Sequence, residues 1–226
     1  MTALIRYQLE LLFRSQRWLP PFLTYVLLMV IGISAGDALL GAYSFSTAVL
    51  LPVTAWYVRC TATGESAASR ACLAAAAGQP RTHLAALLAA LLTGLLLGVA
   101  GLLAVWAVGG RTTTPPQPEA PLPQVLLAGL LGTVVCVLLG VAVGVLCTRP
   151  VLLRAQYGIP VSLGASVLVL VVAGSPANAV VRSLVTASRT ARVTFPVAAL
   201  AESAVLAALV VAGAAVLAGR RTEGGD

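Results

Sequence analysis

Long apolar runs alternate with short polar segments along this chain, and six of the runs approach the length of a membrane-crossing helix. Such a helix needs about 20 mostly apolar residues to cross the hydrocarbon core of a bilayer. The expected spans are residues 19–34, 39–58, 83–108, 123–147, 151–173 and 197–218. The first is short, and the start of the fifth is poorly marked. We therefore predict an all-α integral membrane protein with six spans in one transmembrane domain, residues 1–226.

Residues 1–17 carry a polar arc that predicts a surface helix. At 100° per residue, four side chains fall within an arc of about 80°, namely those of Arg6, Glu10, Arg14 and Arg17. Leucine and isoleucine residues occupy the opposite side, and Glu10 stands four residues from both Arg6 and Arg14. We predict an interfacial helix that turns into the first span at Trp18. The alternative is a first span that begins near Leu9.

The segment between the second and third apolar runs predicts a short helix over residues 65–77. It ends in four consecutive alanines, and alanine is the best helix former. Glu65 is expected in the first turn, where a negative charge suits the helix dipole. Gly78 and Pro80 are expected to end the helix. It is too short to cross a bilayer, so we expect it to lie across one membrane face.

Residues 175–195 predict an amphipathic element before the last span. Ser175-Pro176 is a helix-start signal, with a capping residue followed by proline. Val180, Val181 and Leu184 share one face, and a roughly opposite face carries Arg182, Arg189 and Arg192. We expect an amphipathic helix or short hairpin in the outer leaflet. A plain loop is the alternative.

Small residues recur at four-residue spacing inside three of the apolar runs. The pairs are Gly94 and Gly98 in the third run, Gly140 and Gly144 in the fourth, and Ala214 and Ala218 in the sixth. This spacing lets helix backbones approach closely in lipid. We expect it to serve packing within the chain, with dimerisation as the alternative.

The charges of the chain predict its orientation. All 14 basic residues are arginines. One side of the predicted topology holds ten of them: Arg6, Arg14, Arg17, Arg59, Arg70, Arg81, Arg149, Arg154, Arg220 and Arg221. The other side holds Arg111, Arg182, Arg189 and Arg192. Arginine-rich segments face the cytoplasm, so both termini are expected there. An even number of spans independently requires the two termini to lie on the same side.

Composition excludes several classes of function. Charged residues make up 9% of the chain, whereas a soluble domain needs about 25%. The formal charge of +7 does not indicate nucleic-acid binding, because the arginines form no basic stripe or aromatic platform. Without lysine the chain has no phosphate-binding P-loop, so any ATP-driven work must be powered by another chain.

No catalytic or metal-binding pattern emerges from the residue types that carry such chemistry. The single histidine, His83, and the spacing of the four cysteines match no metal site. We expect neither an enzyme nor a cofactor. The cysteines lie at cytoplasmic helix ends or within the membrane, so no disulfide is expected.

Glu202 is the one acidic residue placed well inside a predicted span. It lies about 9 Å along the helix axis from Pro196. Carboxylates within the membrane are costly and usually functional. Three roles are open: an ion pair with Arg182, Arg189 or Arg192, contact with a cationic group of a substrate, or proton transfer.

This layout resembles the permease subunits of type-2 ATP-binding-cassette (ABC) exporters. The local match lies after the second span: Gly64-Glu65, a helix through Leu73, and Gly78-Gln79-Pro80-Arg81. The resemblance implies that residues 65–77 form a coupling helix, which docks into a groove on a cytoplasmic ATPase subunit. The contact candidates are then Glu65, Arg70, Leu73 and Arg81. It also implies pairing with a second permease half, either an identical copy or a related permease.

The function expected from this resemblance is export of an amphipathic or lipophilic substrate, such as a drug, a peptide antibiotic or a lipid-like molecule. ATP would be hydrolysed by the partner subunit. The arginine- and alanine-rich composition is typical of GC-rich bacterial coding, so the expected location is a bacterial cell membrane. The alternatives are a proton-coupled secondary transporter that uses Glu202, and a non-transporting membrane anchor or accessory subunit.

Overall fold

The structure, a computed structural model, describes residues 1–34, 37–109, 121–148, 158–190 and 192–223, and their regular secondary structure is entirely helical. The helices are α1 (Thr2–Arg14), α2 (Leu19–Gly32), α3 (Leu39–Ala62), α4 (Ala67–Ala77), α5 (Gln79–Gly109), α6 (Leu122–Leu146), α7 (Gly158–Val171), α8 (Pro176–Thr190) and α9 (Val197–Glu223). The prediction of an all-α protein is confirmed. Arg111, Arg149 and Arg154 lie outside the described residues.

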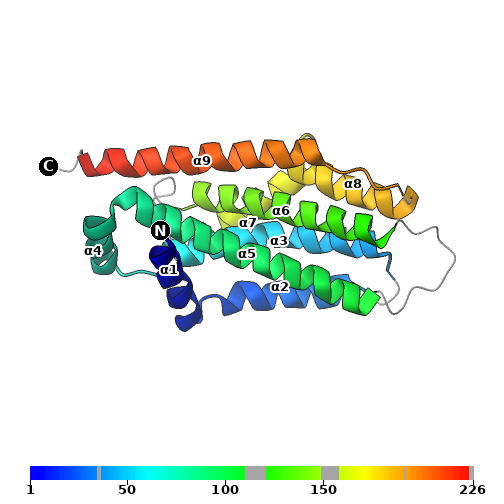
Figure 1. The fold of residues 1–226 in the computed structure, drawn as a ribbon, viewed down its shortest axis with the longest axis horizontal. Coiled ribbons are helices and arrows are strands. Elements are labelled where there is room, and N and C mark those ends of the chain that lie inside the picture. The colour runs from blue at the N-terminus through cyan, green and yellow to red at the C-terminus, as the bar shows by residue number, and fades with distance from the viewer. Residues whose placement is uncertain (35–36, 110–120, 149–157, 191, 224–226) are drawn as a thin grey trace.

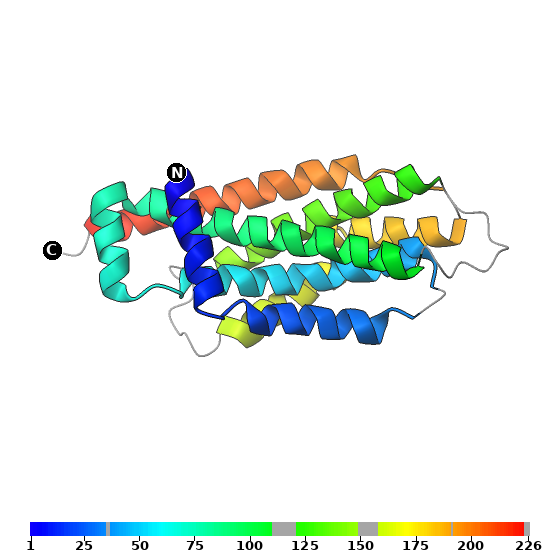
Figure 2. The ribbon, with the colours of Figure 1, turned by 60° about the horizontal axis from the view of Figure 1, so that its bottom comes forward.

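The helices divide into a lengthwise bundle and a transverse pair. The ribbon shows α2, α3, α5, α6 and α9 running along the long axis of the molecule, with α7 and α8 following one another in the same bundle (Figure 1). In both views α1 and α4 lie across that axis at one end (Figure 2). The N-terminus and the C-terminal end of α9 lie toward this same end. We call it the α1–α4 end, and the opposite one the α8–α9 end.

Within the described part of the chain, four helices are long and apolar enough to cross a membrane. These are α3, α5, α6 and α9. The pair α7–α8 passes the same test together but is bent by 55°, so it is either a broken fifth span or a re-entrant loop. Helix α2 is apolar but has only 14 residues, about 21 Å of helix against a hydrocarbon core of about 30 Å. Thus a multi-pass membrane protein is supported, with four or five spans by this criterion.

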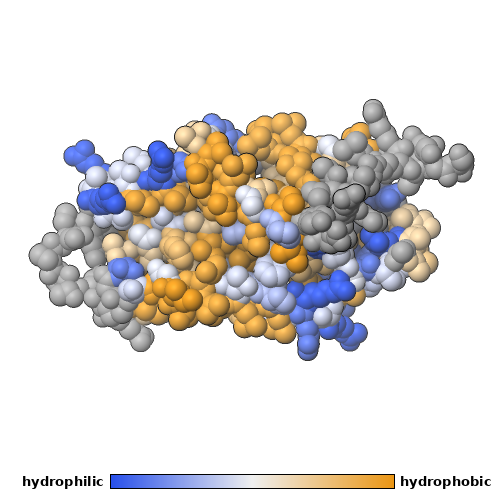
Figure 3. All heavy atoms as spheres, turned by 180° about the vertical axis from the view of Figure 1, so that it is seen from behind, coloured by the Kyte–Doolittle hydropathy of each residue, from blue (hydrophilic) through white to orange (hydrophobic). Residues whose placement is uncertain are grey.

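The outer surface has the distribution of hydropathy that membrane embedding requires. On the back of the molecule, apolar side chains form a broad band, and hydrophilic ones gather toward the two ends (Figure 3). Exposed large apolar residues occur on α2, α5, α6, α7 and α9. Such a surface would be unfavourable in water, whereas lipid solvates it well.

Helix α3 is the centre of the bundle. It packs against α2, α5, α6, α7 and α8. Its close approach to α6 depends on glycine: a Cβ on Gly140 would lie 2.7 Å from the Leu51 carbonyl oxygen, and one on Gly144 would lie 3.0 Å from that of Ala55. Gly94 on α5 faces Thr54 of α3 in the same way. The expected use of the small residues for packing within the chain is confirmed at these positions.

Most hydroxyl groups inside the bundle bond to their own helix. Thr54 Oγ1 donates to the Leu50 carbonyl at 2.8 Å, and Ser166 Oγ donates to that of Ser162 at 2.7 Å. Such bonds give the hydroxyl a partner within its own helix and do not create a binding or catalytic site. The hydroxyls of Tyr25 and Ser46 instead join α2 to α3 at 2.8 Å in the buried core.

Candidate functional site: the α1–α4 end

Helix α4 forms where the sequence predicts a short helix, but it begins two residues later. Ser66 is its N-cap, and the Ser66 side chain accepts a hydrogen bond from the Ser69 backbone N–H at 3.2 Å. Serine is a favoured cap because its hydroxyl satisfies one of the free N–H groups of the first turn. Glu65 therefore precedes the cap, and the expectation that it sits in the first turn was wrong.

The exit from α4 is abrupt because of Gly78. This residue has φ +84°, in the left-handed region that glycine adopts without strain. The chain turns there, and α5 begins at once with Gln79. Pro80 thus stands in the first turn of α5, where its missing N–H costs nothing. The third apolar run is consequently helical from residue 79, four residues before its predicted start, which brings Arg81 into α5.

Three hydrogen bonds hold the end of α3 and the α3–α4 connection against the N-terminal segment. Gln8 Nε2 donates to Glu65 Oε1 at 2.7 Å, and Arg17 Nη1 donates to the Thr63 carbonyl oxygen at 2.7 Å. The Cys60 thiol donates to the Arg17 carbonyl oxygen at 3.4 Å. Bonds that involve charged groups are the stronger kind, so the first two carry most of this attachment.

Gln8 is the residue that sequence reasoning missed. Its side chain is only 4% exposed, on the side of α1 that also buries Leu12. A signal was present: Gln8 is a polar residue opposite the polar arc, in the middle of an apolar stripe. A buried amide needs a hydrogen-bond partner, and Glu65 supplies one from 57 residues away.

Helix α1 turns its apolar side toward the protein. It packs mainly on α5 and makes a smaller contact with α3. Its polar arc faces outward, where Arg6 Nε and Glu10 Oε1 form an ion pair at 2.8 Å with both side chains more than half exposed. This explains why α1 is helical and lies across the bundle axis: one face packs on α5, and the other stays accessible.

The four predicted docking residues gather at this end, and they differ in accessibility. Glu65 and Leu73 are half-buried, whereas Arg70 and Arg81 are exposed. Cys72, also on α4, is the one exposed cysteine; Cys60, Cys136 and Cys147 are buried, and all four are free thiols. The exposed surface of α4 is thus a short, small-residue face with one arginine and one exposed thiol.

At the α8–α9 end the described residues do not show an ion pair of Glu202, which is one of the three roles considered for it. Glu202 is exposed on α9, and Arg182, Arg189 and Arg192 are also exposed. Among the residues that the structure describes, the one salt bridge is that of Arg6 with Glu10. The roles considered for Glu202 therefore remain hypotheses.

Helix α8 has the predicted start, and its apolar face is turned toward the bundle. Ser175 Oγ accepts from the Ala177 N–H at 3.3 Å, and α8 begins at Pro176 as expected. Val180 and Leu184 are buried because α8 packs along α3 and α6. The expected place of this helix in the outer leaflet stays a prediction. Asn178 Nδ2 donates to the Leu170 carbonyl oxygen at 2.6 Å. This bond gives a partner to a carbonyl in the last turn of α7.

The described residues hold no group of three or more histidine, cysteine, aspartate or glutamate side chains that could bind a metal ion. Comparisons with known protein families, curated proteins and solved structures find no match for this chain. Fold and site together define a class: a multi-pass, all-helical membrane protein with a transverse helical pair at one end.

Proposed function

We propose that this protein is the membrane-spanning permease subunit of an ABC exporter, driven by ATP hydrolysis on a separate cytoplasmic subunit. The observation that carries the proposal is the position of α4. This short helix lies across the axis at one end of the bundle, comes between α3 and α5 in the chain, and is tied to α1 through Glu65, which precedes its cap. A helix held in this way is suited to receive a push from a soluble partner.

In this proposal the chain crosses the membrane six times. The spans are α2, α3, α5, α6, the bent pair α7–α8, and α9. The buried bond between Tyr25 and Ser46 supports counting α2, because it fixes α2 lengthwise against α3. The excess of arginine near the α1–α4 end supports a cytoplasmic location for both termini.

The proposed mechanism passes motion from α4 into the bundle by two routes. Arg70, Leu73 and Arg81 contact the ATPase, and its closure displaces α4. One route runs through the α3–α4 connection into α3, against which six other helices pack. The other runs through the Glu65–Gln8 bond into α1 and the turn before α2. Packed helices shift as units, so a small displacement reaches the far end.

The substrate class follows from the interior of the bundle. Buried side chains of the described core are apolar or carry only amide or hydroxyl groups. A bundle with so few polar binding groups suits an amphipathic or lipophilic molecule, for example a drug, a peptide antibiotic or a lipid-like compound. A second permease half, either an identical copy or a related chain, completes the path. The proposed location is the cell membrane of a bacterium.

The rival proposals gain no specific support from the structure. A proton-coupled transporter using Glu202 needs a relay of ionisable groups inside the membrane. Glu202 instead lies on an exposed face of α9, without an ion-pair partner among the described residues. A non-transporting anchor does not account for α4, a helix held across the end of the bundle.

The native thiol of Cys72 gives a direct test of this proposal. In a variant whose three buried cysteines are replaced by alanine, a membrane-impermeant maleimide should label Cys72 only after the cells are opened. Binding of the ATPase subunit should then protect it. As a matched control, Arg192→Cys in a background without other cysteines should be labelled in intact cells. Labelling of Cys72 from outside intact cells would refute the proposed orientation and with it the coupling role of α4.

A further inference from the structure

We propose that the turn between α1 and α2 is a binding site for the headgroup of an anionic phospholipid. In this site Arg14 and Arg17 contact the lipid phosphate, and Phe13 and Trp18 lie beside the glycerol region. The proposal requires only that the chain is embedded in a membrane. It does not depend on the transport function.

The level of this turn in the bilayer follows from the side chains that come after it. On α2, Leu23 is 58% exposed, Leu27 59% and Val30 73%. These apolar side chains face lipid from the second turn of α2 onward. Residues 13–18 precede them and join a helix that lies across the axis. The turn therefore lies at the headgroup level, where aromatic and arginine side chains are favoured.

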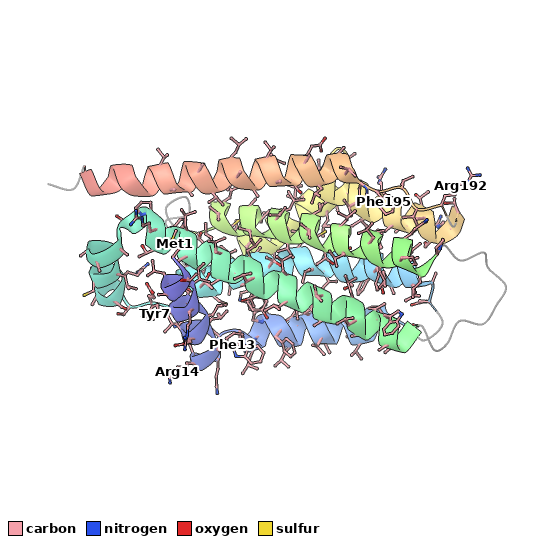
Figure 4. The ribbon with its side chains drawn as sticks, viewed as in Figure 1. Met1, Tyr7, Phe13, Arg14, Arg192 and Phe195 are labelled. Carbon is pink, nitrogen blue, oxygen red and sulfur yellow. The ribbon has the colours of Figure 1, made fainter. Side chains whose placement is uncertain are left out.

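Three aromatic rings in a row pack edge to face along the turn. The Phe13 and Trp18 ring centroids are 5.7 Å apart, and those of Trp18 and Phe22 are 5.3 Å apart, both in edge-to-face geometry. Phe13 remains 49% exposed at the outer end of the row. Figure 4 shows Phe13 and Arg14 at the end of α1 that leads into α2. A rigid half-exposed ring next to a cation suits the boundary between a headgroup and its acyl chains.

The charges of the turn favour an anion. Glu10, the nearby acid, is already paired with Arg6 at 2.8 Å. Arg14 is exposed and has no acidic partner among the described residues. Arg17 is exposed too, and its bond to the Thr63 carbonyl holds the guanidinium in place while leaving other N–H donors accessible. Guanidinium groups bind phosphate oxygens in bidentate geometry, which an ammonium group cannot match.

A lipid bound here would also touch the attachment of α4. Arg17 donates to Thr63 and accepts from the Cys60 thiol, so it links the turn to the α3–α4 connection. Occupancy by an anionic headgroup would hold this part of the chain in one position. We therefore assign the site to a structural lipid and not to transported cargo.

The fluorescence of Trp18 tests the proposal. In a Trp56→Phe, Trp106→Phe variant, Trp18 is the single tryptophan. The protein is placed in matched vesicles of phosphatidylcholine and phosphatidylglycerol, with bromine near the ester end of the acyl chains of either lipid. Brominated phosphatidylglycerol should quench Trp18 more strongly than brominated phosphatidylcholine. Arg14→Gln and Arg17→Gln should each lower this preference about fivefold, the change expected for one arginine at an anionic membrane surface.

Two controls make the result decisive. Arg192→Gln removes an exposed arginine at the other end of the molecule and should leave the preference unchanged. Arg14→Lys keeps the charge and should retain part of it, which separates binding from misfolding. Equal quenching by both lipids would overturn the proposal. Loss of the preference on adding inorganic phosphate at constant ionic strength would also overturn it, because the ligand would then be a free phosphate and not a lipid. Weak quenching that depends on protein density would overturn it as well, because a second copy of the chain would then cover the turn.

Discussion

The two ends of the molecule differ in whether their polar side chains bond to other residues of the chain. At the α1–α4 end, Glu65 is bonded to Gln8 and Arg17 to Thr63, and Arg6 is paired with Glu10. At the α8–α9 end, Arg182, Arg189 and Glu202 are exposed and form no ion pair among the described residues. The first end is thus assembled by the chain itself, whereas the polar groups of the second are left to water, headgroups or another molecule.

Burial of the helices shows a similar contrast. In α3 and α6, 67% of the most apolar window is buried inside the protein, against 22% in α9. A movement of α3 therefore disturbs many neighbours, and a movement of α9 disturbs few. Because α3 leads into the connection to α4, a displacement of α4 in the proposed mechanism enters the bundle through a well-packed helix, and the following predictions differ in size accordingly.

The largest effect is expected from the exposed face of α4. Leu73→Asp and Arg70→Glu should each weaken binding of the ATPase subunit by about 30-fold or more, because a central apolar or arginine contact is typically worth at least about 2 kcal/mol. Co-purification from detergent, with membrane insertion checked by fractionation, measures the loss. Arg182→Glu is the matched control at the other end and should bind normally. A partner retained by both α4 variants would contradict the docking assignment.

A smaller effect is expected from the partly buried bond between Gln8 and Glu65. Glu65→Ala leaves the Gln8 amide buried without its acceptor, which should destabilise the protein by about 1–3 kcal/mol. For a chain of this size each 1 kcal/mol lowers the unfolding midpoint by about 2–4 °C. The thermal midpoint in detergent measures this. The double variant Gln8→Leu with Glu65→Ala should recover part of the loss. Additive losses would mean that the two side chains do not interact.

Loss of the α4 cap should act locally. Ser66→Ala removes the acceptor of the Ser69 N–H and should cost about 1 kcal/mol of helix stability. Hydrogen exchange at the first turn of α4 should then be about fivefold faster, while exchange in α8 stays unchanged. Ser66→Asp, which can also cap, should restore slow exchange. Equal exchange in all three proteins would show that another group caps α4.

The smallest effect is expected at Glu202. Because its side chain is exposed on the least buried span, Glu202→Gln should change ATP-driven transport by no more than about twofold, as for most substitutions on a surface. Uptake into inverted vesicles measures this. Complete loss of transport, with ATP hydrolysis still stimulated, would instead favour the proton-coupled alternative.

The elements of this fold were predictable to the extent that local signals mark them. The ends of α3, α6 and α8 lie within a few residues of the predicted limits, and Ser175-Pro176 marks the start of α8. The start of α4 was misplaced because an acidic residue before a helix suits either the first turn or the position ahead of the cap. The hydroxyl of Ser66 decides between them by bonding to the Ser69 N–H.

The candidate site was predictable only in part. The sequence locates a short helix between two apolar runs, together with Arg70 and Leu73 on it. It does not reveal Gln8, whose partner lies 57 residues away. Nor does it show that α8 packs along α3 and α6, since an amphipathic helix can bury its apolar face against either lipid or protein.

The sequence by itself determined that this is a helical membrane protein. Backbone groups inside a bilayer must bond within their own segment, so long apolar runs have to be helices, and proline, glycine and serine mark where those helices stop and start. The tertiary structure alone decided which side of each helix faces its neighbours. Lipid and protein interior are equally apolar, so hydrophobicity does not set the rotation of a span; close approach at Gly140 and Gly144 and bonds such as Gln8–Glu65 do.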